Sequence, residues 1–155
     1  MPKQSAEILL YRLKSGKTEV LLVHPGGPYW AKKDLGTWSI AKGEIELGEN
    51  LLEAAIRETQ EETRLKVQGE FIPLKSQKQK SVKIIHVWAV QGAFDVSEIE
   101  SNYFEMEWPP KSSKKALVTE IDKAAWFDLR DATLKLVPGQ IPFILELEKL
   151  LQKLL

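Results

Sequence analysis

The segment 50–64 places the strongest constraint on the fold, because its apolar and small residues recur with the period of an α-helix. Five of them share one stripe along that helix: Leu52, Ala55, Ile56, Thr59 and Thr63. Asn50 can cap the helix with its side chain, and Glu53 stands three residues later, as in a capping box. The sequence therefore predicts a helix over 50–64 that buries one face against a core.

Three glutamates gather on another part of the same helix. Glu58, Glu61 and Glu62 stand at i, i+3 and i+4, so their side chains project into one patch. Such like charges destabilise a bare helix by roughly a few tenths of a kcal/mol per pair, and a bound divalent cation would offset that repulsion. Mg²⁺ suits the patch, because it prefers oxygen ligands and commonly bridges a few carboxylates to substrate phosphates. The alternative is an ordinary solvated helix face.

Arg57, next to the first of these glutamates, has two interpretations. It can form a surface ion pair with Glu61 one turn later, worth under about 0.5 kcal/mol. It can also hold a carboxylate in place with its planar guanidinium fork. The sequence alone leaves both interpretations open.

Composition limits the class of protein. The chain has 155 residues and no long polar linker, so we expect one domain over 1–155. Lysine and arginine together number 22, as do aspartate and glutamate, so no net charge draws the molecule to nucleic acid or to an anionic membrane. The lack of cysteine excludes disulfides and thiolate metal sites. We expect a cytoplasmic protein with neither a nucleic-acid nor a membrane partner.

The remaining elements are predicted from short patterns of apolar residues and turn signals, and they indicate an α+β protein. Strands are expected at 6–13, 19–24, 36–40, 65–74, 81–90 and 124–129. The segment 94–107 is interpreted as loop. A leucine-rich helix over 141–155 is expected to cover the sheet, although its apolar stripe could also form a dimer seam, so both a monomer and a homodimer stay open.

The string GEIELGENLLEAAIRETQEETRL, residues 43–65, resembles the Nudix box. Its matching positions are Gly43, Glu49, Arg57, Glu58, Glu61, Glu62 and Leu65. Two positions depart from the family pattern, since Thr59 replaces an apolar residue and Arg64 stands where a glycine is usual. The resemblance implies a Nudix hydrolase with an α/β/α sandwich, a mixed sheet, and the box and terminal helices on opposite faces. Arg64 raises the question of how the box helix ends, because a left-handed residue other than glycine costs about 1–2 kcal/mol.

The resemblance also implies roles for the residues of the box. Glu61 and Glu62 would be the main metal ligands, joined by the backbone carbonyl of Lys42, which precedes the box glycine, Gly43. Glu58 would be a general base or a further ligand, and Glu61 is a second catalytic candidate. Arg57 would orient Glu58, and Glu49 would brace Arg57 and approach a second metal. The implied cofactor is Mg²⁺, with Mn²⁺ able to substitute.

A fourth acid in this family often precedes a late strand. Glu120 fits that place best, and its rivals are Asp122, Glu105 and Glu107. Substrate contacts must come from outside the box, and the candidates are aromatic or basic residues: Tyr29, Trp30, Tyr103, Phe104, Trp108, Lys78 and Lys80. For each of these the alternative is a role in the core or a solvated side chain.

The implied reaction is metal-dependent hydrolysis of a diphosphate linkage in a small nucleotide. Nucleoside triphosphates and dinucleoside polyphosphates are the leading substrates, because the run WSIAKGE over 38–44 resembles polyphosphate-cleaving members of the family. A sugar-nucleotide pyrophosphohydrolase and a non-catalytic nucleotide-binding module remain as alternatives.

Overall fold

Strand β1 (Gln4–Lys14) lies at the centre of a mixed sheet. The computed structural model describes residues 4–45, 48–74, 77–78, 84–92 and 94–153. Strand β1 runs antiparallel to β2 (Lys17–Pro25) and to β3 (Lys42–Glu44), and parallel to β6 (Ile84–Gln91). Strand β9 (Ile121–Asp128) pairs antiparallel with β2 and extends the sheet on that side. The predicted hairpin over 6–24 and the predicted late strand are confirmed.

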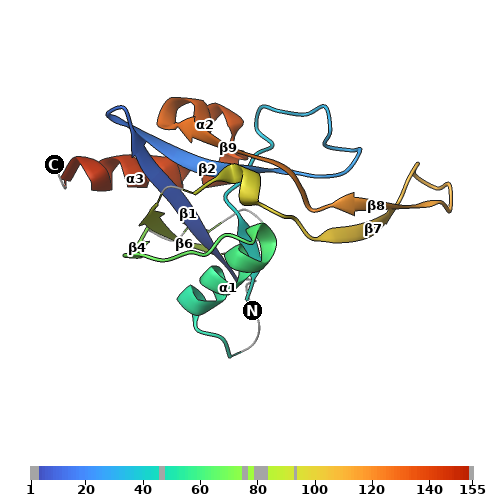
Figure 1. Cartoon of the computed structure of the whole chain (residues 1–155), viewed down its shortest axis with the longest axis horizontal. Coiled ribbons are helices and arrows are strands. Elements are labelled where there is room, and N and C mark those ends of the chain that lie inside the picture. The colour runs from blue at the N-terminus through green and yellow to red at the C-terminus, as the bar shows by residue number, and fades with distance from the viewer. Residues whose placement is uncertain (1–3, 46–47, 75–76, 79–83, 93, 154–155) are drawn as a thin grey trace.

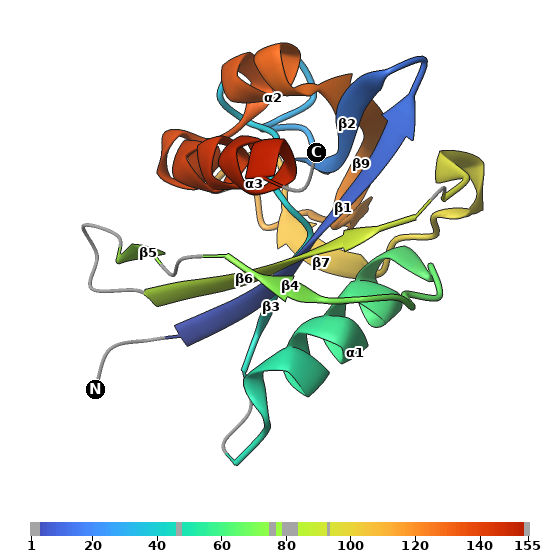
Figure 2. The same cartoon turned by 90° about the vertical axis from the view of Figure 1, so that its left-hand side faces the viewer.

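Alternation along β1 sends its apolar side chains to both faces of the sheet. Ile8 and Leu10 pack in the cluster that contains Ala55 of helix α1 (Leu51–Thr63). Leu9 and Tyr11 pack in the cluster that contains the buried residues of helix α3 (Ile141–Lys153) and Ala132 of helix α2 (Leu129–Lys135). Figure 2 shows α2 and α3 on one side of the sheet and α1 on the other. The predicted sandwich with a mixed sheet is confirmed, and none of the described helices has the length and apolarity to span a membrane.

A second, two-stranded sheet projects from this body (Figure 1). It is the hairpin of β7 (Tyr103–Glu107) and β8 (Lys115–Thr119), which follows a short 3-10 helix, η1 (Val96–Glu98). The interpretation of 94–107 as loop was therefore wrong for the 3-10 helix over 96–98 and for the strand over 103–107. Phe104 and Met106 share one face of β7, with Glu105 and Glu107 on the other, but the strand has only five residues and all except Met106 are exposed, so its pattern is weak.

Two other predicted strands were largely wrong. Around 36–40 the structure has only isolated bridges, Ser39 with Val23 and Trp38 with Leu136. Between 65 and 74 only β4 (Ile72–Pro73) pairs with β6, and β5 (Gln77–Lys78) follows it. The earlier apolar residues pack beneath α1 instead, and the Val67 N–H donates to Oε1 of Gln60 at 3.1 Å. Residues 81–83 of the predicted strand 81–90 lie outside the described residues.

Helix α1 ends where the sequence raised a question. Asn50 Oδ1 accepts from the Glu53 N–H at 3.1 Å, as predicted for the N-cap. At the other end Arg64 is left-handed, with φ 64°, so the helix does not run on. The Arg64 guanidinium donates to the carbonyl of Glu61 at 2.6 Å and to Oδ1 of Asn102 at 2.7 Å. These bonds help to stabilise a conformation that is unfavourable for arginine.

The left-handed backbone predicts a difference between two variants. Arg64→Gly and Arg64→Ala both lose the contacts with Glu61 and Asn102, but only alanine retains the steric cost of a positive φ. We expect Arg64→Gly to have a free energy of unfolding about 1 kcal/mol higher than Arg64→Ala, measured by urea denaturation. Equal stability of the two variants would contradict a left-handed residue at this position.

Candidate functional site

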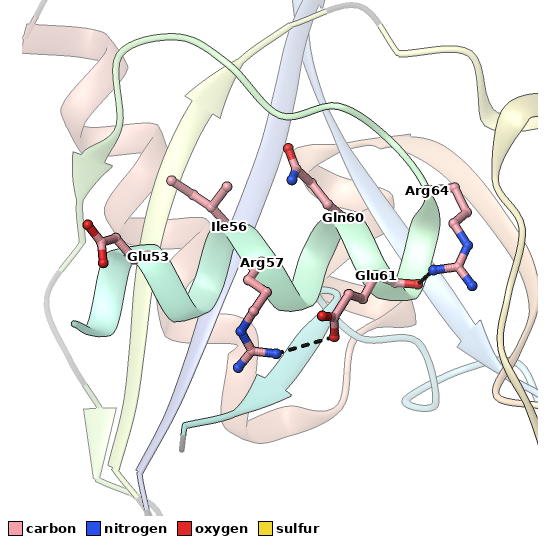
Figure 3. Close-up of a pocket in the computed structure, with 6 residues that line it drawn as sticks. All are labelled: Glu53, Ile56, Arg57, Gln60, Glu61 and Arg64. Carbon is pink, nitrogen blue, oxygen red and sulfur yellow. Dashed lines mark hydrogen bonds and ion pairs between the residues drawn. The ribbon is translucent and has the colours of Figure 1, made fainter. Parts of the chain in front are cut away.

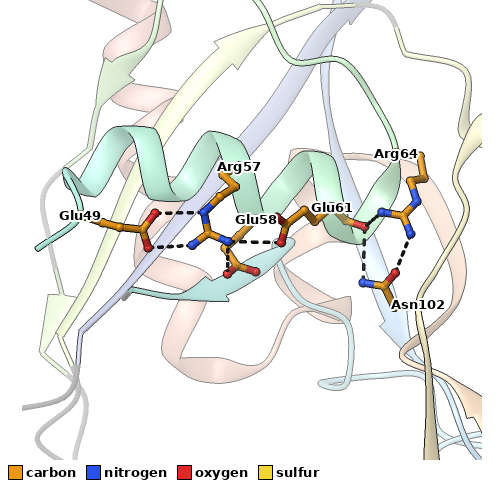
Figure 4. Close-up of polar contacts among 6 residues, drawn as sticks. All are labelled: Glu49, Arg57, Glu58, Glu61, Arg64 and Asn102. Carbon is orange, nitrogen blue, oxygen red and sulfur yellow. Dashed lines mark hydrogen bonds and ion pairs between the residues drawn. The ribbon is translucent and has the colours of Figure 1, made fainter. Parts of the chain in front are cut away.

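Arg57 gathers three carboxylates around its guanidinium (Figure 4). Its Nε and Nη2 donate to the two oxygens of Glu49 at 3.0 and 2.7 Å, a bidentate arrangement. Its Nη1 donates to Oε1 of Glu58 at 2.9 Å and to Oε2 of Glu61 at 3.2 Å. The hydrogen bond with Glu49, followed by that with Glu58, raises the pKa of Arg57 well above its usual value. The group is therefore a permanent cation among acids.

Local sequence explains how these four side chains meet. Arg57 and Glu61 stand one turn apart on α1, and Glu58 is adjacent to Arg57, so the helix itself presents two of the carboxylates. Glu49 lies just before the N-cap, after a turn in which Gly48 takes φ 85°. That positive φ suits glycine, and the turn brings Glu49 back beside the helix. Both contacts considered from the sequence are present, the ion pair with Glu61 and a guanidinium fork on a carboxylate, that of Glu49.

The three box glutamates differ in exposure. The side chain of Glu61 is 53% exposed, whereas that of Glu58 is 25% exposed. Glu62 lies closest to the buried stripe of α1, and its Oε2 is out of contact with solvent. Glu62 and Glu58 therefore lie at the edge of the core, and Glu61 reaches furthest into solvent.

The donor chemistry of this cluster fits a hard divalent cation, since every side-chain donor is a carboxylate oxygen. Glu58 and Glu61 already direct oxygens at one positively charged nitrogen, Nη1 of Arg57. Within the described ranges, no three acidic or histidine side chains come close enough together to hold a metal ion. Holding a cation would therefore require Glu58 or Glu61 to turn away from Arg57.

The start of the box lies on the neighbouring strand. Lys42 and Gly43 belong to β3 and pair with Glu7 and Ala6 of β1. Helix α1 packs beside both β1 and β3. Lys42 and Gly43 therefore lie in a strand of the sheet beside α1.

The four candidates for the last acid occupy different places. Glu120 lies between β8 and β9, and its N–H donates to the carbonyl of Asn102 at 2.9 Å. Asn102 in turn contacts the end of α1 through Arg64. Asp122 instead hydrogen-bonds the buried ring of His24 at 2.7 Å. The remaining two, Glu105 and Glu107, lie on the projecting strand β7.

Sequence reasoning missed Asn102 and His24. Neither belongs to a motif, and their partners are distant in the chain, so no local pattern could have identified them. Asn102 links the segment before Glu120 to the end of α1, and His24 engages Asp122.

A comparison with known protein families establishes the family to which this chain belongs. The family model described as NUDIX domain matches residues 1–147. The chain belongs to the Nudix family. The predicted enzyme class, a Nudix pyrophosphohydrolase, is thereby confirmed.

Solved Nudix structures share the fold at low sequence identity. The C. elegans Ap4A hydrolase in a binary complex is 20% identical, with TM-score 0.65 and coverage of 97% of this chain and 98% of that chain. The NUDIX domain of Shewanella oneidensis NrtR, complexed with ADP ribose, is 14% identical, with TM-score 0.66 and coverage of 97% and 89%. A mutT/nudix family protein from Listeria innocua is 16% identical, with TM-score 0.68 and coverage of 99% and 96%. No curated protein matches the sequence.

Two of the predicted substrate-contacting residues lie in the loop of residues 26–37, here called the aromatic loop. Tyr29 and Trp30 are 56% and 37% exposed, and their rings meet edge to face with centroids 4.7 Å apart. The Lys33 ammonium lies over the Tyr29 ring, 3.8 Å from its centroid. The pair is exposed in this Nudix fold rather than part of the core.

The other predicted contacts are separate from the aromatic loop in sequence. Tyr103 and Phe104 begin β7 and are 64% and 40% exposed, and Trp108 follows the end of that strand. Lys78 lies in β5, and Lys80 lies outside the described residues. The aromatic candidates therefore divide between the aromatic loop and the projecting hairpin.

A surface hollow of about 440 Å³ runs along the outer flank of α1 (Figure 3). Its lining residues are Glu53, Ile56, Arg57, Gln60, Glu61 and Arg64. The hollow shares Arg57 and Glu61 with the acidic cluster, but neither Glu58 nor Glu62 lines it. We therefore assign it no part in the chemistry of the Nudix box.

The Arg57 cluster predicts a salt-dependent loss of stability. In Arg57→Gln three carboxylates no longer share a cation, so we expect a lower free energy of unfolding than in the wild type. Added salt should reduce the deficit, because it screens the repulsion among Glu49, Glu58 and Glu61. Urea denaturation at low and high salt measures this, with Arg130→Gln on the exposed face of α2 as the matched control. A deficit unchanged by salt would argue against the electrostatic account.

Proposed function

We propose that this Nudix enzyme hydrolyses a diphosphate linkage in a nucleoside diphosphate derivative, with nucleoside triphosphates and dinucleoside polyphosphates as its leading substrates. The observation that carries the proposal is the approach of Glu58 and Glu61 to one nitrogen of Arg57. This arrangement keeps two carboxylates together beside the half-buried Glu62, where a cation and a phosphate group can both be accommodated.

Arg57 is proposed to position the acids rather than to contact phosphate. Its Nε and Nη2 are engaged by Glu49, which leaves Nη1 to the two helix acids. If Glu58 or Glu61 turns toward a cation, Glu49 still fixes the guanidinium in place. The other helix acid then remains oriented by the same Nη1.

The proposed cofactor is Mg²⁺, for which Mn²⁺ can substitute. The proposed ligands are the side chains of Glu58, Glu61, Glu62 and Glu120 and the backbone carbonyl of Lys42. In such sites a divalent cation neutralises charge on the phosphate oxygens and activates water. Glu120 is preferred as the fourth acid because its backbone is linked through Asn102 to the end of α1, whereas the Asp122 carboxylate serves His24.

The proposed reaction is an in-line displacement at phosphorus. Water attacks one phosphorus of the diphosphate, and a carboxylate of the box takes the proton that the water loses. The P–O bond of the anhydride breaks, and the leaving phosphate departs with the bridging oxygen. The products are a nucleoside monophosphate, or another phosphorylated moiety, and the remaining phosphate fragment. Glu58 and Glu61 are the two candidates for the base.

The choice of substrate rests on features outside the box. The name of the C. elegans relative, an Ap4A hydrolase, favours a dinucleoside polyphosphate, and the run 38–44 favours the same class. The exposed pair Tyr29 and Trp30 offers rings on which a base can stack. The ADP ribose complex of the NrtR domain supports the second candidate, a nucleoside diphosphate linked to a sugar.

The proposal extends to the setting of the reaction. We infer that the enzyme acts on small nucleotides in the cytoplasm, because the equal numbers of acidic and basic residues favour neither a nucleic-acid nor a membrane partner. Both a monomer and a homodimer are compatible with this function.

Glu62→Gln is the direct test of the box. The variant keeps the size of the side chain but removes its charge, and we expect the rate to fall at least ~100-fold. The measurement is release of monophosphate from a panel of Ap4A, ATP and ADP ribose in the presence of Mg²⁺.

Glu53→Gln is the matched control for that test. It changes a glutamate of the same helix on the flank away from Glu58 and Glu62, and its rate should stay near that of the wild type. Near-normal activity of Glu62→Gln would overturn the assignment of this acid. A wild type that binds these nucleotides without turnover would support a non-catalytic module instead.

A further inference from the structure

His24 is a buried histidine outside the Nudix box whose two ring nitrogens both have partners. It lies in β2 with 1% exposure. Its Nδ1 is 2.7 Å from Oδ1 of Asp122, and its Nε2 is 2.6 Å from the backbone oxygen of Lys33. Because a carbonyl oxygen only accepts, Nε2 carries a hydrogen and donates it. The Trp38 ring packs edge to face against the imidazole, 5.2 Å between centroids, and helps to fix its plane.

The residue that His24 holds also organises the exposed aromatic pair. The Lys33 backbone is bound to the imidazole, while its ammonium lies 3.8 Å from the centroid of Tyr29 and 5.1 Å from that of Trp30. Cation–aromatic attraction and the edge-to-face contact keep the two rings in one arrangement. A continuous series of contacts therefore runs from Asp122 on β9 through His24 to the aromatic rings.

Both ends of the aromatic loop are fixed independently. Near its start, the Gly26 N–H donates to the carbonyl of Glu120 at 2.9 Å, and a Cβ on Gly26 would lie 1.9 Å from the Thr119 carbonyl oxygen. Near its end, Asp34 accepts from Nε1 of Trp38 at 2.8 Å and pairs with Lys135. His24 contacts the loop at Lys33, between these two fixed ends. This contact therefore helps to set the position of Tyr29 and Trp30.

We propose that His24, oriented by Asp122, is a positioning residue that holds the aromatic loop so that Tyr29 and Trp30 form a platform for the base of the substrate. This inference rests on the proposed function for the identity of the ligand as a nucleotide. It assigns the Asp122 carboxylate to orientation of His24 and gives the pair a part in discriminating nucleotides from other diphosphates. His24 itself contacts no substrate in this account.

Two substitutions of His24 separate the two ends of the imidazole. In His24→Gln the amide nitrogen can occupy the place of Nε2 and donate to the Lys33 carbonyl. In His24→Asn the amide nitrogen stands near the place of Nδ1, so it can reach Asp122 but not Lys33. Both variants put a neutral amide into the same buried position, which makes each a control for the other. His86→Gln, which changes the histidine that bonds Gln4, controls for loss of a histidine elsewhere.

Binding of two non-hydrolysable probes is the readout. The probe α,β-methylene ADP carries a base, and methylene diphosphonate does not, so a loop role affects only the first. We expect His24→Asn to weaken binding of α,β-methylene ADP about tenfold, as loss of one stacked base would. Binding of methylene diphosphonate should change less than about twofold. His24→Gln and His86→Gln should bind both probes much as the wild type does.

Limited digestion with trypsin follows the loop itself. Cleavage after Lys32 or Lys33 requires the loop to open, so His24→Asn should be cut there faster than the wild type and His24→Gln should not. The inference is overturned if the two His24 variants behave alike, if both probes weaken equally, or if the wild type binds both probes with the same affinity. Absence of hydrolysis of Ap4A, ATP and ADP ribose by the wild type, with the binding pattern as expected, would remove the proposed hydrolysis and leave this inference standing.

Discussion

The hydrogen bonds of Arg57 are the interaction on which the rest of the site depends. One guanidinium engages Glu49 with two nitrogens and uses its third for Glu58 and Glu61. Without a cation, glutamates so close on one helix would repel each other. The cluster is therefore held at the edge of the core by a charge that the chain itself supplies, beside the half-buried Glu62. In the proposed function, carboxylates that Arg57 now holds would bind a divalent cation.

The sheet sets where that helix lies. Alternate residues of β1 pack against α1 on one face and against the C-terminal helices on the other, so the box helix is held by the central strand. From its last turn a series of polar contacts leads outward. Arg64 binds Asn102, the Asn102 carbonyl accepts from Glu120, and the Glu120 carbonyl accepts from Gly26 at the start of the aromatic loop. Glu120 thus lies between the acidic helix and the loop that carries Tyr29 and Trp30.

The sequence predicted the box helix, because the features that determine it are local. The apolar periodicity, the capping residue and the spacing of the acids all lie within 50–64, and the structure has a helix there. The errors fell where a local pattern was weak or misleading. Val67 bonds the side chain of Gln60 instead of pairing in a strand, and the exposed strand β7 offers only five residues of alternation. Within the box, the contacts of Glu58 and Glu61 with Arg57 follow from their spacing, whereas the contact between His24 and Asp122 joins residues 98 positions apart. The departure of Arg64 from the family pattern left open how the helix ends, and the structure answers this with a left-handed Arg64 at the C-cap.

The most direct test of this account is a crystal structure with Mn²⁺ and a non-hydrolysable dinucleotide. The account predicts an anomalous peak bound by carboxylates of Glu58, Glu61 and Glu62, with Arg57 still held by Glu49 and the diphosphate against the metal. Glu120 should be the nearest acid from outside the helix. A metal bound elsewhere, with Glu58 and Glu61 still paired to Arg57 and the diphosphate distant from them, would contradict it.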